Sequence, residues 1–79
     1  MTVPGVVHLE MPDQLQIFVN GESDTLEAPA TVAALIARRA PRPPFAVEVN
    51  KRLVRRSTYE STPLAEGDRV EIVTLVGGG

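Results

Sequence analysis

Apolar residues recur at helical spacing in only one segment of this chain, and alternating apolar and polar residues account for much of the sequence beyond residue 14. The helical segment is 31–39, where Val32, Leu35 and Ile36 recur at helical spacing. Thr31 can cap the first turn, and three prolines that follow closely prevent the helix from continuing. Because 79 residues supply only one hydrophobic core, the chain is predicted to be one domain with a single helix.

Strands are predicted where apolar and polar residues alternate. Leu15, Ile17 and Val19 share one face of the first strand, and Asn20-Gly21 supplies the two left-handed positions of a tight hairpin turn. The predicted strands are 15–19, 23–28, 45–49, 53–54 and 69–76. Two strands, one helix and three further strands are typical of a sheet that one helix covers on one face.

The fold class predicted from this order is α+β, with one mixed sheet of four to five strands packed on one helix. We expect the first and last strands to lie side by side in the centre because they are the most apolar. The predicted domain spans 15–76. An irregular amino-terminal extension precedes it at 1–14, and a flexible glycine tail follows at 77–79.

Phe18, Val73 and Leu75 are expected on the sheet face that points away from the helix, because their neighbours in each strand point toward it. An exposed apolar group beside the start of the glycine tail is suited to docking on another protein. Two alternatives stay open. The extension at 1–14 folds over this face, or the three residues simply fill space in a thin domain.

The composition argues against several classes of function. The chain has no Cys, which excludes a disulfide, a thiolate ligand and a thiol nucleophile. His8 is the only histidine, so we expect no metal site, no catalytic site and no bound cofactor. The apolar stretches are too short to cross a bilayer, and residues 1–14 do not resemble a signal peptide. These features predict a cytoplasmic protein that does not enter a membrane.

Charge is unevenly distributed in this chain, whose net charge is −2. Residues 38–56 carry seven Lys or Arg residues against Glu48 alone, whereas residues 1–37 carry five acids and no base. Clustered arginines are a feature of nucleic-acid binding, but Phe45 is the only aromatic residue within this basic run. We therefore expect a solvated or partner-facing surface and no nucleic-acid partner.

The sequence closes on Gly77, Gly78 and Gly79, directly after the last predicted strand. Residues without side chains can enter a narrow channel in another protein. A carboxylate is unreactive toward nucleophiles, but its attack on the α-phosphate of ATP forms an acyl-adenylate that sulfide or an amine can displace. A terminal glycine run also fits a linker or a frayed end. Its position directly after a central strand favours a role for the carboxylate of Gly79.

Several motifs between residues 15 and 79 form a recognisable pattern. They are Gln16-Ile17-Phe18-Val19-Asn20-Gly21-Glu22, Thr31-Val32, Val47-Glu48-Val49-Asn50, Arg55-Arg56-Ser57-Thr58-Tyr59, Thr62-Pro63-Leu64, Gly67-Asp68-Arg69-Val70-Glu71-Ile72 and Gly78-Gly79. This pattern resembles the sulfur carrier proteins of thiamine biosynthesis, the ThiS family, which have the ubiquitin-like β-grasp fold. Gly78 and Gly79 match the invariant pair of that family, whereas Gly77 lies where the family varies.

The resemblance implies a carrier and co-substrate rather than an enzyme. A ThiF-type adenylyltransferase would use ATP to adenylate Gly79, and sulfur from a donor such as a cysteine desulfurase would convert the adenylate to a thiocarboxylate. A ThiG-type thiazole synthase would then take the sulfur for the thiazole ring. Three alternatives remain open from the residues: the small subunit of molybdopterin synthase, a ubiquitin-like protein modifier, and a β-grasp binding module that needs no free carboxylate.

Overall fold

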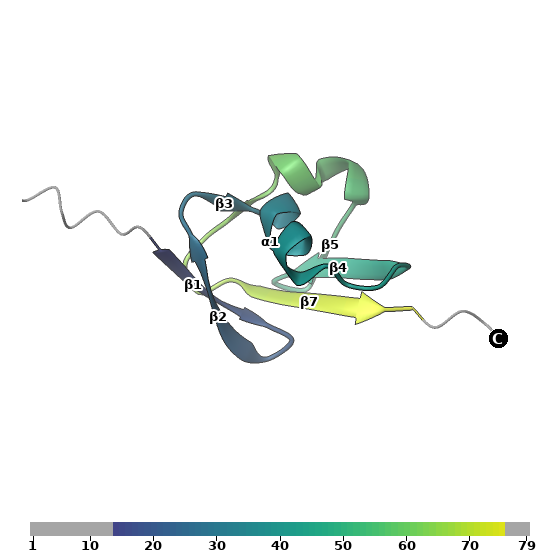
Figure 1. The fold of residues 1–79 in the computed structure, drawn as a ribbon, viewed down its shortest axis with the longest axis horizontal. Coiled ribbons are helices and arrows are strands. Elements are labelled where there is room, and N and C mark those ends of the chain that lie inside the picture. The colour runs from purple at the N-terminus through teal and green to yellow at the C-terminus, as the bar shows by residue number, and fades with distance from the viewer. Residues whose placement is uncertain (1–13, 76–79) are drawn as a thin grey trace, which may run out of the picture.

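The computed structural model describes residues 14–75 of the chain (Figure 1). Its elements are the strands β1 (Gln14–Val19), β2 (Glu22–Glu27) and β3 (Ala30–Thr31), the helix α1 (Val32–Arg39), the strands β4 (Phe45–Val49) and β5 (Arg52–Val54), the 3₁₀-helix η2 (Arg56–Ser61), and the strands β6 (Pro63–Leu64) and β7 (Arg69–Thr74). The five strands and the helix expected from the sequence are all present, and β3 and β6 are additional.

Five of the strands form one mixed sheet in the order β2-β1-β7-β4-β5. The last strand, β7, lies in the middle, where it pairs in parallel with β1 and antiparallel with β4. The remaining pairs, β1 with β2 and β4 with β5, are antiparallel hairpins. The first and last strands are therefore neighbours, as predicted from their apolar content.

The two hairpins turn at residues that accept a left-handed backbone. Asn20 and Gly21 have φ angles of 51° and 85°, and Asn50 and Lys51 have φ angles of 52° and 72°. Asn and Gly tolerate this region better than other residues, which fits three of these four turn positions, and Lys51 is the exception. The prediction of the Asn20-Gly21 turn is confirmed.

The helix begins and ends as its sequence dictates. The Thr31 hydroxyl accepts a hydrogen bond of 3.2 Å from the Ala34 N–H, which satisfies a donor that the first turn leaves free. At the other end Ala40 adopts a left-handed conformation with φ of 47°, and its N–H donates to the Ile36 carbonyl at 2.8 Å. The prolines beyond Ala40 prevent a further turn.

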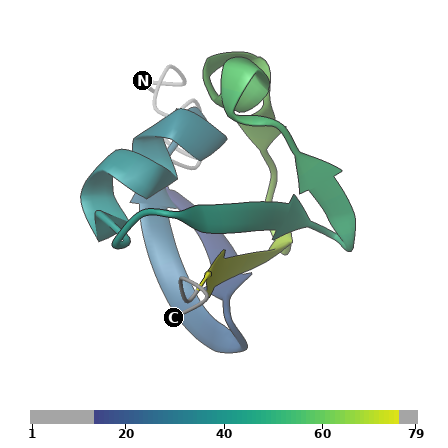
Figure 2. The same ribbon diagram turned by 90° about the vertical axis from the view of Figure 1, so that its right-hand side faces the viewer.

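The helix α1 and the 3₁₀-helix η2 lie on the same side of the five-stranded sheet (Figures 1 and 2). Between helix and sheet is a core of ten buried apolar residues: Ile17, Val19, Leu26, Ala30, Val32, Leu35, Val47, Leu64, Val70 and Ile72. The short strands β3 and β6 pair with each other through Ala30 and Leu64. The opposite side of the five-stranded sheet, here named the open face, is covered by none of the described elements.

Candidate functional site

The carboxyl-terminal strand is held on the β4 side up to the last described residue and on the β1 side as far as Ile72. Beyond the end of β7, the Leu75 N–H donates to the Pro44 carbonyl at 2.8 Å and so extends the ladder with β4. Four residues, 76–79, follow in the sequence. The predicted tail residues Gly77, Gly78 and Gly79 lie outside the described part of the chain.

Two asparagine side chains from the hairpin turns also hold β7. The Asn20 Oδ1 accepts the Ile72 N–H at 2.8 Å, and its Nδ2 donates to the Ile72 carbonyl at 3.2 Å. The Asn50 Oδ1 accepts the Arg69 N–H at 3.0 Å, while its Nδ2 donates to the Asp68 carboxylate at 3.0 Å. Each asparagine therefore closes a turn and supplies a ladder bond to β7.

These bonds form because each turn ends beside the central strand. The Asn20 backbone N–H donates to the Val70 carbonyl at 2.8 Å, which places its side chain level with Ile72. The Asn50 backbone N–H likewise donates to the Arg69 carbonyl at 2.7 Å. The sequence did not predict the contacts of either asparagine with β7, because these contacts depend on the strand order.

The open face carries the three residues predicted as a docking group, but it does not bring all three together. Val73 and Leu75 are 47% and 49% exposed, and they lie at the end of β7 that leads to the glycines. Phe18 pairs with Arg69 at the beginning of β7. At roughly 3.3 Å per residue, four residues of strand separate the levels of Phe18 and Val73 by about 13 Å.

Phe18 is also less accessible than the other two residues. Its side chain is half-buried, and the Arg69 guanidinium carbon lies 5.2 Å from the centre of its ring. Arg69 and Glu71 precede Val73 on the same face of β7. Phe18 therefore lies beside the beginning of β7 and not beside its end, because alternation predicts the face that a residue occupies but not the register of β1 with β7.

Leu53 is an apolar residue of the open face that sequence reasoning missed. It is 66% exposed, and it lies opposite Glu48, which in turn lies opposite Glu71 of β7. The signal in the sequence was the inward-facing Val54, since its neighbour must then point outward. The open face thus combines Leu53, Val73 and Leu75 with two glutamates that face each other across neighbouring strands.

Part of the basic run is used within the fold. The Arg38 guanidinium contacts the Asp24 carboxylate at 2.9 Å, and that of Arg39 lies 3.8 Å from the other carboxylate oxygen. That second oxygen is buried and accepts no hydrogen bond from a described residue. These two arginines at the end of α1 therefore face β2, whereas the sequence predicted a solvated or partner-facing surface.

Two further expectations concern metals and membranes. Within residues 14–75 there is no group of three or more His, Cys, Asp or Glu residues arranged to hold a metal ion. His8 lies outside the described residues. No helix of the described chain has both the length and the apolar character needed to cross a membrane.

One helix packed across a mixed five-stranded sheet, with the last strand in the middle, defines a small ubiquitin-like protein of the β-grasp fold. The model of the ThiS family matches residues 10–79. The chain is also similar to the crystal structure of a thiamine biosynthesis protein (ThiS) from Geobacter metallireducens. The TM-score is 0.70 at 26% sequence identity, over 82% of this chain and 100% of that one. The chain belongs to the ThiS family.

Two curated relatives are considerably longer than this chain. The thiazole synthase of Magnetococcus marinus is 39% identical over 66 residues, and that of Paramagnetospirillum magneticum is 35% identical over 66 residues. Each match covers 82% of this chain but 20% of the relative. The chain therefore spans about a fifth of the length of these relatives.

Proposed function

We propose that this chain is a sulfur carrier protein of thiamine biosynthesis, which other proteins load and unload and which catalyses no reaction itself. The observation that carries the proposal is the position of β7. This strand is held by β1, by β4 and by two asparagine side chains, and the three glycines follow it almost directly in the sequence. A rigid base of this kind fixes where a short glycine segment can reach. Membership of the ThiS family supports the same function.

In this proposal the carboxylate of Gly79 is the group that carries sulfur. It attacks the α-phosphorus of ATP in the active site of a ThiF-type adenylyltransferase, and pyrophosphate leaves. The persulfide of a donor such as a cysteine desulfurase then attacks the acyl carbon, and AMP leaves. A thiol attacks the donor's cysteine sulfur in the resulting acyl disulfide. This step releases the thiocarboxylate and leaves a disulfide on the donor.

The proposed acceptor of the sulfur is a ThiG-type thiazole synthase. Two relatives carry the name thiazole synthase, and a segment similar to this chain makes up about a fifth of each. A carrier and its acceptor joined in one protein would keep the carrier at high effective concentration. This arrangement in the relatives supports a thiazole synthase as the partner that takes sulfur from Gly79.

The proposed docking surface for the adenylyltransferase is the open face around Val73, Leu75 and Leu53. Their exposed fractions lie between 47% and 66%, which is unusual for three large apolar residues on one side of a small domain. Val73 and Leu75 lie on the strand that leads to the glycines, so a protein bound there also reaches the chain end. Charged side chains, Glu48 and Glu71, border these residues.

The experiment is intact-mass spectrometry of the purified chain after incubation with a ThiF-type adenylyltransferase, ATP and sulfide. We expect a mass increase equal to replacing one oxygen by sulfur, and no increase when ATP is omitted. Complementation separates the two carrier functions, because a thiamine carrier restores growth of a thiamine auxotroph and does not restore molybdenum-cofactor synthesis. An unchanged mass in the complete mixture, or adducts on lysines of other proteins, would contradict the proposal.

A further inference from the structure

Four arginines of the basic run are not used by the ion pairs of the fold. Arg42, Arg52, Arg55 and Arg56 are exposed, and none forms an ion pair with any residue between 14 and 75. Arg38 and Arg39, by contrast, share the Asp24 carboxylate. Two of these four arginines lie in the region of η2 and the proline segment, because Arg56 begins η2 and Arg42 stands between Pro41 and Pro43 in the sequence.

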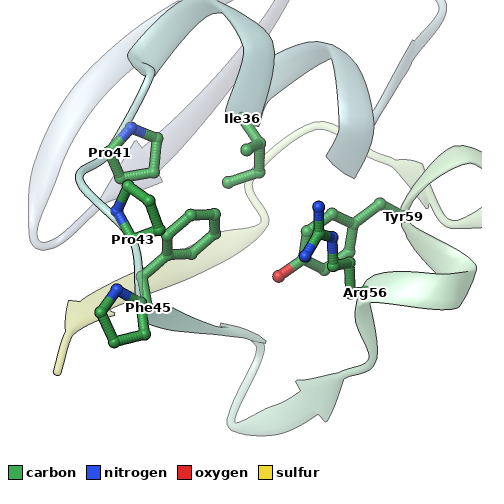
Figure 3. A pocket seen from close by; sticks show the side chains of 7 residues that line it. Ile36, Pro41, Pro43, Phe45, Arg56 and Tyr59 are labelled. Carbon is green, nitrogen blue, oxygen red and sulfur yellow. The ribbon is translucent and has the colours of Figure 1, made fainter.

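The same region contains an open pocket of about 420 Å³. One wall consists of three prolines that follow the helix, Pro41, Pro43 and Pro44, together with Phe45 at the start of β4. Ile36 of α1 closes one side, and Tyr59 and Arg56 of η2 form the opposite wall. Figure 3 shows the Phe45 ring and the Tyr59 side chain on opposite sides of this space, with Arg56 beside Tyr59.

The chemistry of the walls restricts what can bind. Prolines have no N–H to donate, so the proline wall offers mainly apolar contact. The side-chain donors that line the pocket are the Arg56 guanidinium and the Tyr59 hydroxyl, and neither has a hydrogen-bond partner among the described residues. A ligand that is largely apolar and carries an acidic group fits these walls. A bare phosphate, which needs several convergent donors, does not.

A second hollow adjoins the pocket and favours an extended ligand. It shares Ile36, Arg56 and Tyr59 with the pocket and is also lined by Ala33 of α1 and Glu60 of η2. The two adjoining hollows, both bordered by α1 and η2, are here named the groove. A peptide can place one large side chain in the pocket and lay its flanking residues along the groove and the arginines.

The pocket also lies next to the base of the carboxyl-terminal segment. Its Pro44 carbonyl accepts the hydrogen bond of 2.8 Å from the Leu75 N–H. The pocket is on the helix side of β7, whereas Val73 is on the open face. A partner that handles the chain end can therefore contact the domain on both sides of the last strand.

We propose that the pocket between Ile36, Phe45 and Tyr59 binds a large apolar side chain of a partner protein, and that acidic residues flanking this side chain pair with Arg56 and Arg42. This inference rests on the proposed function in one respect, which is that the partner is a protein that acts on the chain end. It adds a second docking site to the open face.

The test is a titration of the full ¹⁵N-labelled chain with the peptide acetyl-Glu-Asp-Phe-Asp-Glu-amide, followed by amide chemical shifts. We expect the largest shifts at Ile36, Phe45 and Arg56. Arg56→Glu should weaken binding at least tenfold, whereas Arg52→Glu should weaken it less than threefold. Arg52 is the matched control, because it is an exposed arginine of the same basic run on β5.

Replacing the peptide's Phe with Ala should also weaken binding at least tenfold. The spectra of both variants show whether they remain folded.

Four results would overturn the inference: no binding at millimolar peptide, equal losses in the two variants, shifts centred on Val73, or a response to inorganic phosphate that exceeds the response to the peptide. The proposed function is tested separately, by measuring the mass of the chain after incubation with the adenylyltransferase, ATP and sulfide. A chain that gains sulfur but ignores the peptide disproves only the pocket. A chain that binds the peptide but gains no sulfur disproves only the carrier function.

Discussion

Replacing Asn20 tests whether the hairpin turns hold the last strand. Asn20 makes two hydrogen bonds with Ile72, one through each atom of its amide, and both are partly buried. It also has a φ of 51°, a conformation that Gly adopts without strain and Ala does not. Asn20→Gly therefore removes the two bonds alone, whereas Asn20→Ala removes them and adds backbone strain.

The expected losses of stability follow from the two hydrogen bonds and from the backbone strain. A typical intramolecular hydrogen bond contributes about 1 kcal/mol net, so Asn20→Gly should lower the free energy of unfolding by about 1–2 kcal/mol. A left-handed conformation costs a residue with a Cβ roughly 1–2 kcal/mol, so Asn20→Ala should lose about 2–4 kcal/mol. For a domain of this size each kcal/mol corresponds to about 4–8 °C in Tm.

The assay is urea denaturation followed by circular dichroism, combined with amide hydrogen exchange measured by NMR. We expect the Ile72 amide to exchange faster in Asn20→Gly than global unfolding alone explains, because its acceptor has been removed. Asn50→Gly is the matched control, since its side chain bonds the Arg69 N–H at the other end of β7. It should expose the Arg69 amide and leave Ile72 protected. Unchanged stability and unchanged exchange at Ile72 in Asn20→Gly would refute the reasoning.

Three further predictions test other parts of the structure. Val73→Asp should raise the KM of the adenylyltransferase for the carrier at least tenfold. The control Thr74→Asp, on the opposite face of β7, should change this KM less than threefold, and equal effects would argue against docking on the open face. Thr31→Ala should cost about 1 kcal/mol of stability in urea denaturation by removing the helix cap, and Thr31→Ser should be nearly neutral; equal losses would disprove the capping role. Asp24→Asn should cost about 1 kcal/mol, because Asp24 is largely buried but the Arg38 and Arg39 side chains are 51% and 37% exposed, and the loss should shrink in high salt. A large, salt-independent loss would contradict this.

The parts of the fold that could be predicted are those that local pattern decides. The hairpin at Asn20-Gly21, the cap at Thr31 and the faces of β7 each follow from residues close together in the sequence. The pairing of β3 with β6 does not, because Ala30 and Leu64 are far apart in the chain and each strand has two residues. Such a short strand has no period to detect.

The docking group was only partly predictable for a similar reason. Alternation fixes which face of a strand a residue occupies, so Val73 was correctly placed on the face opposite the helix. The position of Phe18 along β7 depends on the register of β1 against β7, which no local pattern reveals. The pocket at Tyr59 also needed the tertiary structure, because α1, the proline segment and η2 each supply only one of its walls.

The most direct test of the carrier function compares the intact chain with two variants, one that lacks Gly79 and one that has an alanine added after it. Each is incubated with the adenylyltransferase, ATP and sulfide, and its intact mass is measured. We expect the replacement of one oxygen by sulfur in the intact chain and in neither variant, although all three should unfold at the same urea concentration. Equal sulfur incorporation in the variants would contradict the carrier function of Gly79.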